Sequence, residues 1–310
     1  MNAAGEPIRD EEHLERIRSL VIPPAWQEVW ISPNPGARIQ ATGVDAAGRT
    51  QYRYHASFRA AQERAKFERL LDFAKALPTL RTTTARHLRG EVFELEWTSA
   101  LAVGLVNKAW FRVGSDRHAR RSRTYGITTL TKRHAVVSGD EVQFCFRAKN
   151  RKLVRRTIRN STLARGVGDL LELPGGSRLF RYERDGELFA LTGPQLNEYL
   201  GEHMGDGFTV KDFRTWGGTL LAASELARHG PVDDEREAKR ALAAAMRVVG
   251  QELGNTATVA RESYVSPLVV DAFLAGRTLE DFRRSNGREP RRHLSVDERS
   301  LVSLLRSESQ

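Results

Sequence analysis

Basic and phenolic side chains suited to phosphate chemistry recur in four segments of the chain, residues 111–114, 146–149, 211–219 and 253–265. An arginine offers a rigid fork of N–H donors that fits phosphate oxygens, a lysine can give up a proton, and a tyrosine can act as a nucleophile. Singly, each has an ordinary alternative: Arg112 as a snorkelling side chain at a helix end, Arg214 as a surface charge, Tyr264 as a partly buried core aromatic. Their order and spacing carry the functional interpretation.

The elements that would position these residues are mainly helical. Apolar residues at helical spacing predict helices over residues 99–112, 163–171, 194–203, 209–228, 233–253, 267–275 and 294–306. Between them, alternating and β-branched residues predict a three- or four-stranded antiparallel sheet from segments 125–130, 134–137, 142–148 and 153–158. Lys149 and Asn150 then form the turn of a hairpin.

The first part of the chain has a different pattern. It predicts a short helix at residues 11–20, strands at 26–31, 37–42 and 50–55, and a long helix at 58–77 that Pro78 ends. We therefore expect an α+β protein with two domains. Residues 1–78 would form a small β-containing domain, and residues 79–310 a mainly α-helical domain with a small antiparallel sheet.

Together the segments resemble the type IB DNA topoisomerases of the small poxviral and bacterial branch, whose pattern is Arg, Lys, Arg, then His or Asn, then Tyr. The resemblance covers nearly the whole chain. Arg112 lies in the matching hydrophobic-Arg-hydrophobic-Gly segment, Lys149 at the matching hairpin tip, and Arg214 in the matching K-D-x-R-T-x-G segment, 211–217. Asn255 and Tyr264 take the last two places. The resemblance implies the tyrosine recombinase/topoisomerase IB catalytic fold for residues 79–310 and a DNA clamp for residues 1–78.

The resemblance also implies a reaction. Tyr264 would cut one strand of duplex DNA through a transient 3'-phosphotyrosine bond, supercoils would relax by strand rotation, and the strand would be rejoined. Arg112 and Arg214 would hold the nonbridging phosphate oxygens, and Lys149 would protonate the leaving 5' oxygen. Because a phenolate is a better leaving group than an alkoxide, the step is reversible and needs no ATP. The group that removes the phenol proton stays open.

Asn255 departs from the poxviral pattern, which has histidine at this point. An asparagine donates a hydrogen bond but cannot exchange a proton, so we expect it only to stabilise the oxyanion. A helix C-cap after Gly254 is the alternative, and both roles are compatible.

Further DNA contacts are expected from both domains. Residues 48–55 resemble the family segment whose Gln and two Tyr touch bases and backbone, which selects Arg49, Gln51, Tyr52 and Tyr54. An amphipathic strand with inward-facing tyrosines is the alternative. Two basic stretches of the larger domain are also candidates, although some of their charges would simply be solvated. The first contains Arg117, Arg120, Arg121 and Arg123, and the second Arg151, Lys152, Arg155 and Arg156.

Composition agrees with an anionic partner. Lys and Arg total 49 against 39 Asp and Glu, a net charge of +10, which favours nucleic acid. The single cysteine, Cys145, rules out an intramolecular disulfide and a thiolate zinc cluster, and no Gly-rich phosphate loop occurs. We therefore expect double-stranded DNA as partner, no metal, no nucleotide or other cofactor, no membrane segment, a monomer, and a cytoplasmic, nucleoid-associated location.

Two other functions stay open. A tyrosine recombinase uses the same chemistry but usually has His-x-x-Arg where this chain has residues 211–214, and it normally carries a helical N-terminal domain. A DNA-binding protein without catalysis would bind DNA but form no covalent complex. Relaxation of a supercoiled plasmid by a monomer, without paired sites, would separate these functions.

Overall fold

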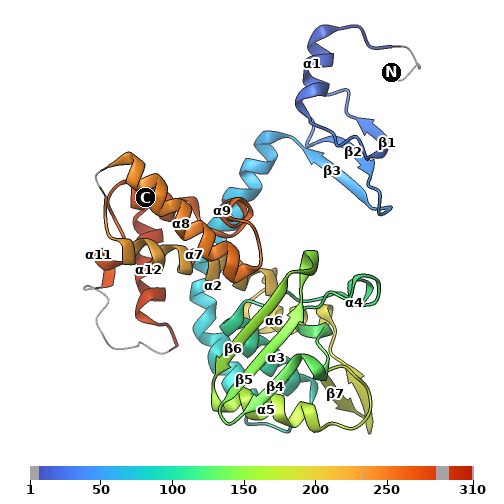
Figure 1. Ribbon diagram of the computed structural model, residues 1–310, viewed down its shortest axis with the longest axis vertical. Coiled ribbons are helices and arrows are strands. Elements are labelled where there is room, and N and C mark those ends of the chain that lie inside the picture. The colour runs from blue at the N-terminus through green and yellow to red at the C-terminus, as the bar shows by residue number, and fades with distance from the viewer. Residues whose placement is uncertain (1–6, 233, 284–292, 309–310) are drawn as a thin grey trace. The chain divides into compact units, whose positions relative to one another are not determined.

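The computed structural model, which describes residues 7–232, 234–283 and 293–308, combines helices with small antiparallel sheets (Figure 1). This is the α+β class that the sequence predicts. The helices are α1 (Glu11–Ser19), α2 (Ala56–His87), α3 (Leu95–Ala109), α4 (Asp116–Ser122), α5 (Ser161–Glu172), α6 (Gly193–Met204), α7 (Val210–His229), α8 (Glu235–Leu253), α9 (Ala257–Tyr264), α10 (Pro267–Leu274), α11 (Leu279–Arg283) and α12 (Val296–Ser307). The strands are β1 (Gln27–Ile31), β2 (Ile39–Val44), β3 (Thr50–Tyr54), β4 (Ala135–Ser138), β5 (Glu141–Arg147), β6 (Leu153–Arg159), β7 (Arg181–Arg184) and β8 (Glu187–Ala190).

The chain divides into two compact units, Met1–Glu68 and Arg69–Gln310. The division falls inside α2, ahead of the boundary expected near Pro78. The prediction that Pro78 ends a helix is wrong, because α2 continues to His87. Proline removes one backbone hydrogen bond, but Leu77 and Leu80 on either side of it are buried, and their packing outweighs that loss.

The smaller unit contains one antiparallel sheet in the order β1-β2-β3. Successive residues of β3 alternate between its two faces: Gln51 and Arg53 are half-buried, whereas Tyr52 and Tyr54 are exposed. The two tyrosine rings stack with their centroids 6.0 Å apart. The alternative with inward-facing tyrosines is therefore excluded.

The core of the larger unit is built around α3, of which most residues are buried. The sheet β4-β5-β6 packs against α3 and α5 (Figure 1). It has three strands, because residues 125–130, predicted as a strand, form a buried 3-10 turn at Ile127–Thr129. The Thr129 hydroxyl donates to the Gly126 carbonyl and accepts from the Gly126 N–H, and such side-chain bonds favour a turn over a strand.

Several elements were not predicted from the sequence. They are α4, α9, α11 and the hairpin β7-β8. The hairpin had a readable signal, because its turn is Asp185-Gly186 with φ of 54° and 77°, and Asp-Gly with both φ positive is typical of a tight hairpin turn. The predicted helix 233–253 is present as α8 from Glu235, and its first residue, Asp233, lies outside the described residues.

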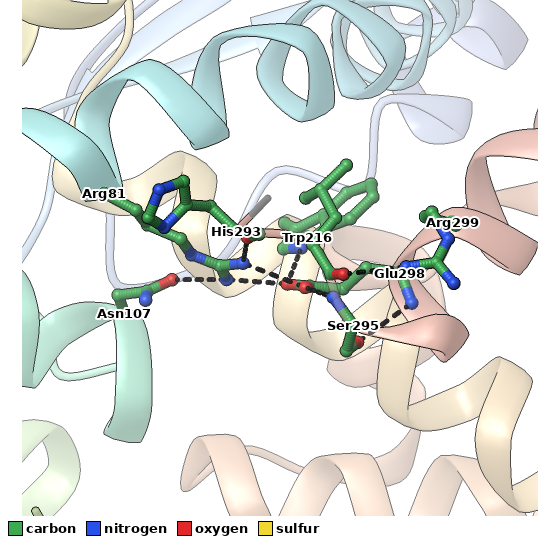
Figure 2. Close-up of polar contacts among 8 residues, drawn as sticks. Arg81, Asn107, Trp216, His293, Ser295, Glu298 and Arg299 are labelled. Carbon is green, nitrogen blue, oxygen red and sulfur yellow. Dashed lines mark hydrogen bonds and ion pairs between the residues drawn. The ribbon is translucent and has the colours of Figure 1, made fainter. Parts of the chain in front are cut away.

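A polar network ties three helices of the larger unit together (Figure 2). The carboxylate of Glu298, on α12, accepts two hydrogen bonds from Arg81, on α2, at 2.9 and 2.7 Å. It also accepts one at 3.3 Å from the indole of Trp216, on α7. Trp216 lies two residues after Arg214, so this network fixes the helix that carries one of the candidate site residues.

Candidate functional site

Arg112 is positioned by the way α3 ends. Trp110 adopts a left-handed conformation with φ of 52° and stops the helix. Phe111 then turns inward against Phe144, with ring centroids 5.2 Å apart, and Arg112, the next residue, is half-buried. Its carbonyl accepts a hydrogen bond of 2.7 Å from the Ile127 N–H. The neighbouring backbones are so close that a Cβ at Gly126 would lie 2.4 Å from that carbonyl oxygen.

Arg214 is a buried cation held by backbone carbonyls. Its side chain has 4% exposure and donates to the carbonyl oxygens of Trp110 and Leu253, each at 2.7 Å. Trp110 is thus both the residue that ends α3 before Arg112 and an acceptor for Arg214. The two arginines, far apart in sequence, are fixed by one piece of backbone.

Asn255 follows the C-terminus of α8, where Gly254 takes the left-handed cap position with φ of 64°. The backbone N–H of Asn255 donates to the Gly250 carbonyl at 2.7 Å, as in a Schellman cap. Its side-chain oxygen instead accepts from Nη2 of Arg112 at 2.8 Å. Its side-chain nitrogen is buried and has no hydrogen-bond partner among the described residues. The capping contact therefore belongs to the backbone, which leaves the amide side chain in the site.

Tyr264 is the last residue of α9 and lies against α7. The hydroxyl of Thr219 donates to the Tyr264 carbonyl at 3.1 Å and accepts from the Ser266 N–H at 3.1 Å. Gly218 allows this approach, because a Cβ there would lie 2.8 Å from the Tyr264 carbonyl oxygen. The Arg214 guanidinium carbon lies 5.0 Å from the centre of the Tyr264 ring.

The charges around Tyr264 favour its ionised form. Burial opposes ionisation of the phenol, but the charge and hydrogen bond of Arg214, with the charges of Arg112 and Lys211, outweigh it and hold its pKa below the ordinary value. Burial, followed by the charge of Arg112, lowers the pKa of Arg214 to about 10. Burial also lowers the pKa of Arg112, against the charge and hydrogen bond of Tyr264. Both guanidiniums remain charged at neutral pH, so the site is strongly electropositive.

Lys149 is the one candidate catalytic residue outside this group. It begins the 3-10 turn Lys149–Arg151 that joins β5 to β6, and its side chain is exposed. Among the residues that the structure describes, it has no hydrogen bond or ion pair. The structure therefore brings together Arg112, Arg214, Asn255 and Tyr264, and leaves Lys149 at the tip of a hairpin.

The candidate DNA-contact residues of the smaller unit do not share one face. Arg49 and Gln51 both bond to Asp45, at 2.8 and 2.9 Å, and the Arg49 hydrogen bond lowers the pKa of Asp45 to about 2. Because strand residues alternate, Gln51 and the exposed Tyr52 and Tyr54 point to opposite sides of β3. In the larger unit the candidates are exposed: Arg117 and Arg121 on α4, and Arg151 in the hairpin turn.

Sequence reasoning missed the residues that hold the site together. The carbonyls of Trp110 and Leu253, which fix Arg214, carry no side-chain signal. Thr219 and Lys211 lie in the segment 211–219 that the sequence singled out, at positions to which no role was assigned. Within the described ranges, no group of three or more His, Cys, Asp or Glu could hold a metal ion, and none of the described helices is long and apolar enough to cross a membrane.

Comparison with known proteins agrees with the fold. Residues 55–267 match the family described as eukaryotic DNA topoisomerase I, catalytic core, and residues 1–45 match bacterial DNA topoisomerase IB, N-terminal domain. A DNA topoisomerase 1B of Acanthamoeba polyphaga mimivirus is 34% identical over 269 residues, which cover 84% of this chain and 80% of that protein.

The fold and these matches thus define an enzyme that acts on DNA. The chain belongs to the type IB DNA topoisomerase family. This membership decides between the functions that the sequence left open, in favour of a topoisomerase over a recombinase or a non-catalytic DNA-binding protein.

Proposed function

We propose that the protein relaxes supercoiled DNA by reversible transesterification at Tyr264, without ATP or a metal ion. The phenolic oxygen attacks a backbone phosphorus, the bond from phosphorus to the 5' oxygen breaks, and a 3'-phosphotyrosine forms. The phenolic proton is released to water, and the leaving 5' oxygen takes a proton from Lys149. The reverse sequence rejoins the strand after it has rotated.

One observation carries this proposal: the guanidiniums of Arg112 and Arg214, from separate segments, both act on the phenol of Tyr264. Their charges outweigh its burial and lower its pKa, and the Arg214 guanidinium carbon lies 5.0 Å from the centre of its ring. A phosphate attacked by this phenol must enter the same electropositive space, where fixed donors stabilise the charge that develops on its nonbridging oxygens. The unpartnered side-chain nitrogen of Asn255 adds a donor that does not titrate. This supports the oxyanion role for Asn255.

Lys149 fits the role of general acid by its chemistry and its position. A 5' oxygen is a poor leaving group, so a proton donor speeds its expulsion. The exposed hairpin leaves the ammonium free to meet bound DNA. We further propose that the exposed arginines Arg117, Arg121 and Arg151 bind phosphates, and that residues 1–68 supply a second DNA-binding surface through Tyr52 and Tyr54 or through Arg49 and Gln51.

The test is plasmid relaxation in the presence of EDTA and the absence of ATP, with mapping of the trapped adduct. The wild-type protein should relax the plasmid and leave a denaturant-resistant adduct on the 3' side of the break. Tyr264→Phe should bind DNA but form no adduct. Tyr125→Phe is the matched control, because its hydroxyl only accepts a bond from exposed Arg133. Adduct formation by Tyr264→Phe would remove Tyr264 as nucleophile.

A further inference from the structure

Two basic side chains of the β5-β6 hairpin contact the C-terminal end of α8. The Lys152 ammonium donates to the backbone carbonyl of Asn255 at 3.0 Å. Arg156 donates to the backbone carbonyl of Glu252 and lies 3.1 Å from its carboxylate. Both residues belong to a stretch that the sequence offers for phosphate binding, yet in the structure each donates to a backbone carbonyl, Arg156 half-buried and Lys152 exposed.

The end of α8 is a favourable place for cations. The last carbonyls of a helix have no partners within it and carry the negative end of the helix dipole. Arg156 and Arg214 occupy two of these carbonyls, those of Glu252 and Leu253, and Lys152 binds the carbonyl of Asn255 two residues further on. Cations from α7 and from the hairpin thus meet at one helix terminus, whose carbonyls offset their mutual repulsion.

The Lys152 contact also fixes where Lys149 lies. The turn between them is closed by a hydrogen bond of 2.8 Å from the Ala148 N–H to the Lys152 carbonyl. Inside it, Asn150 and Arg151 both have left-handed backbones, with φ of 60° and 57°, an uncommon pair for residues other than glycine. A turn restricted in this way moves together with the two residues that close it, Ala148 and Lys152. The bond from Lys152 to Asn255 therefore ties the turn that carries Lys149 to a residue that bonds Arg112.

We propose that Lys152 is a positioning residue for leaving-group expulsion: by binding the carbonyl of Asn255, it holds the Lys149 turn beside the scissile phosphate. This inference rests on the proposed function, in which Lys149 gives its proton to the 5' oxygen as the phosphorus–oxygen bond breaks. Lys152 itself transfers no proton. The role differs from phosphate binding, which would affect DNA affinity and not one chemical step.

The experiment is single-turnover cleavage of a duplex oligonucleotide by the full chain, with either the normal 5' oxygen or a 5'-bridging sulfur at the scissile phosphate. A thiolate leaves without a general acid, so sulfur should rescue variants that damage only that step. Lys152→Met should cleave the oxygen substrate at least about tenfold more slowly, with the roughly 10²–10⁴-fold contribution of a general acid as the upper limit, and the sulfur substrate near the wild-type rate. Lys152→Arg should recover most of the loss.

Two further variants sharpen the result. Lys149→Met/Lys152→Met should be no slower on the oxygen substrate than Lys149→Met, because a residue that acts only through Lys149 adds nothing once Lys149 is gone. Arg159→Met removes one positive charge from the same hairpin, at the last residue of β6, where the arginine pairs with Glu141 at 2.9 Å, and should leave both rates unchanged.

The outcomes separate this inference from the proposed function. A wild-type protein that forms no adduct with either substrate, or a Lys149→Met variant that sulfur does not rescue, would refute the proposed chemistry and this inference with it. A rescued Lys149→Met beside an unrescued Lys152→Met, weaker DNA binding by Lys152→Met, or an unchanged rate on the oxygen substrate would overturn the positioning role alone.

Discussion

Replacing Asn255 with aspartate separates the two functions of its side chain. The amide oxygen accepts a bond of 2.8 Å from Arg112, and the amide nitrogen is the buried donor without a partner among the described residues. Asn255→Asp keeps the shape and the acceptor but replaces that donor with an oxygen. The change therefore leaves the contact with Arg112 in place and removes the bond proposed for the phosphate.

The expected loss of cleavage rate follows from the removal of this one donor. Loss of one preorganised oxyanion donor slows a reaction by about 100- to 1000-fold, or roughly 2.7–4 kcal/mol of transition-state stabilisation. The new carboxylate would also repel the phosphate and partly neutralise the charge of Arg112. A 100-fold loss of rate is therefore the lower bound. Stability should not fall, because the contact between residue 255 and Arg112 becomes an ion pair.

The assay is the rate of adduct formation with enzyme in excess over a duplex oligonucleotide, together with a thermal melt of each variant. Asn255→His, which restores a donor, should lose less activity than Asn255→Asp. An Asn255→Asp variant that cleaves within tenfold of the wild-type rate would show that the amide nitrogen does not bind the phosphate. A large drop in melting temperature would refute the expected ion pair.

Three other perturbations test the framework of the site. Gly126→Ala should destabilise the fold by about 1–3 kcal/mol and slow cleavage, because the new Cβ would lie 2.4 Å from the Arg112 carbonyl oxygen. Glu298→Gln should lower stability by on the order of 3 kcal/mol, because it breaks a mostly buried pair with Arg81. Burial raises the pKa of the Glu298 carboxyl, but the hydrogen bond and charge of Arg81 outweigh it and hold the pKa below its ordinary value. The stability that this pair contributes is therefore complete above the ordinary glutamate pKa of about 4.3 and is lost as pH falls through the lowered pKa. Finally, Arg112→Met should raise the apparent pKa of Tyr264 in the pH–rate profile of the sulfur substrate, because a cation that favours the phenolate is gone.

Matched variants control for these changes. Gly168→Ala, in α5, places its Cβ where no atom beyond its own stretch of helix lies within 4 Å, so denaturant unfolding should detect no loss of stability. Glu235→Gln removes an exposed ion pair with Lys239 and should leave acid unfolding almost unchanged. Equal acid sensitivity of Glu298→Gln and the wild-type protein would show that the pair with Arg81 does not make stability depend on pH. An Arg112→Met profile in which the apparent pKa of Tyr264 does not rise would show that Arg112 does not favour the phenolate.

Local sequence patterns predicted most elements of the fold because the deciding interactions are local. Apolar spacing located α7 and α8, and alternation located β5 and β6. The patterns failed where distant contacts decide the outcome. Pro78 lies inside α2 because the leucines around it are buried in the larger unit. Residues 125–130 form a turn because distant hydrogen bonds add to the local ones of Thr129: the N–H groups of Ile127 and Thr128 donate to the carbonyls of residues 112 and 113.

The candidate site could be predicted as a set of side chains but not as an arrangement. Arg112, Arg214, Asn255 and Tyr264 could be chosen by type and order, since each lies in a segment with its own pattern. Nothing local to Gln51 shows that Asp45 binds it. Nor does the sequence show that Lys152, one of four basic candidates for phosphate binding in residues 151–156, would donate to the backbone carbonyl of Asn255 instead.

The acceptors that orient Arg214 are as much a part of the site as its guanidinium. An arginine that was free to change rotamer would lose conformational entropy when DNA binds. Arg214 instead loses it during folding, because two hydrogen bonds to backbone carbonyls fix its side chain. Those carbonyls belong to Trp110 and Leu253, where α3 and α8 end. The indole of Trp110 also lies so close to α7 that a Cβ at Gly217 would fall 2.2 Å from its nitrogen. Gly217 is thus required, because only a residue without a Cβ lets α7 lie close enough to Trp110 for Arg214, on the same helix, to bind the Trp110 carbonyl.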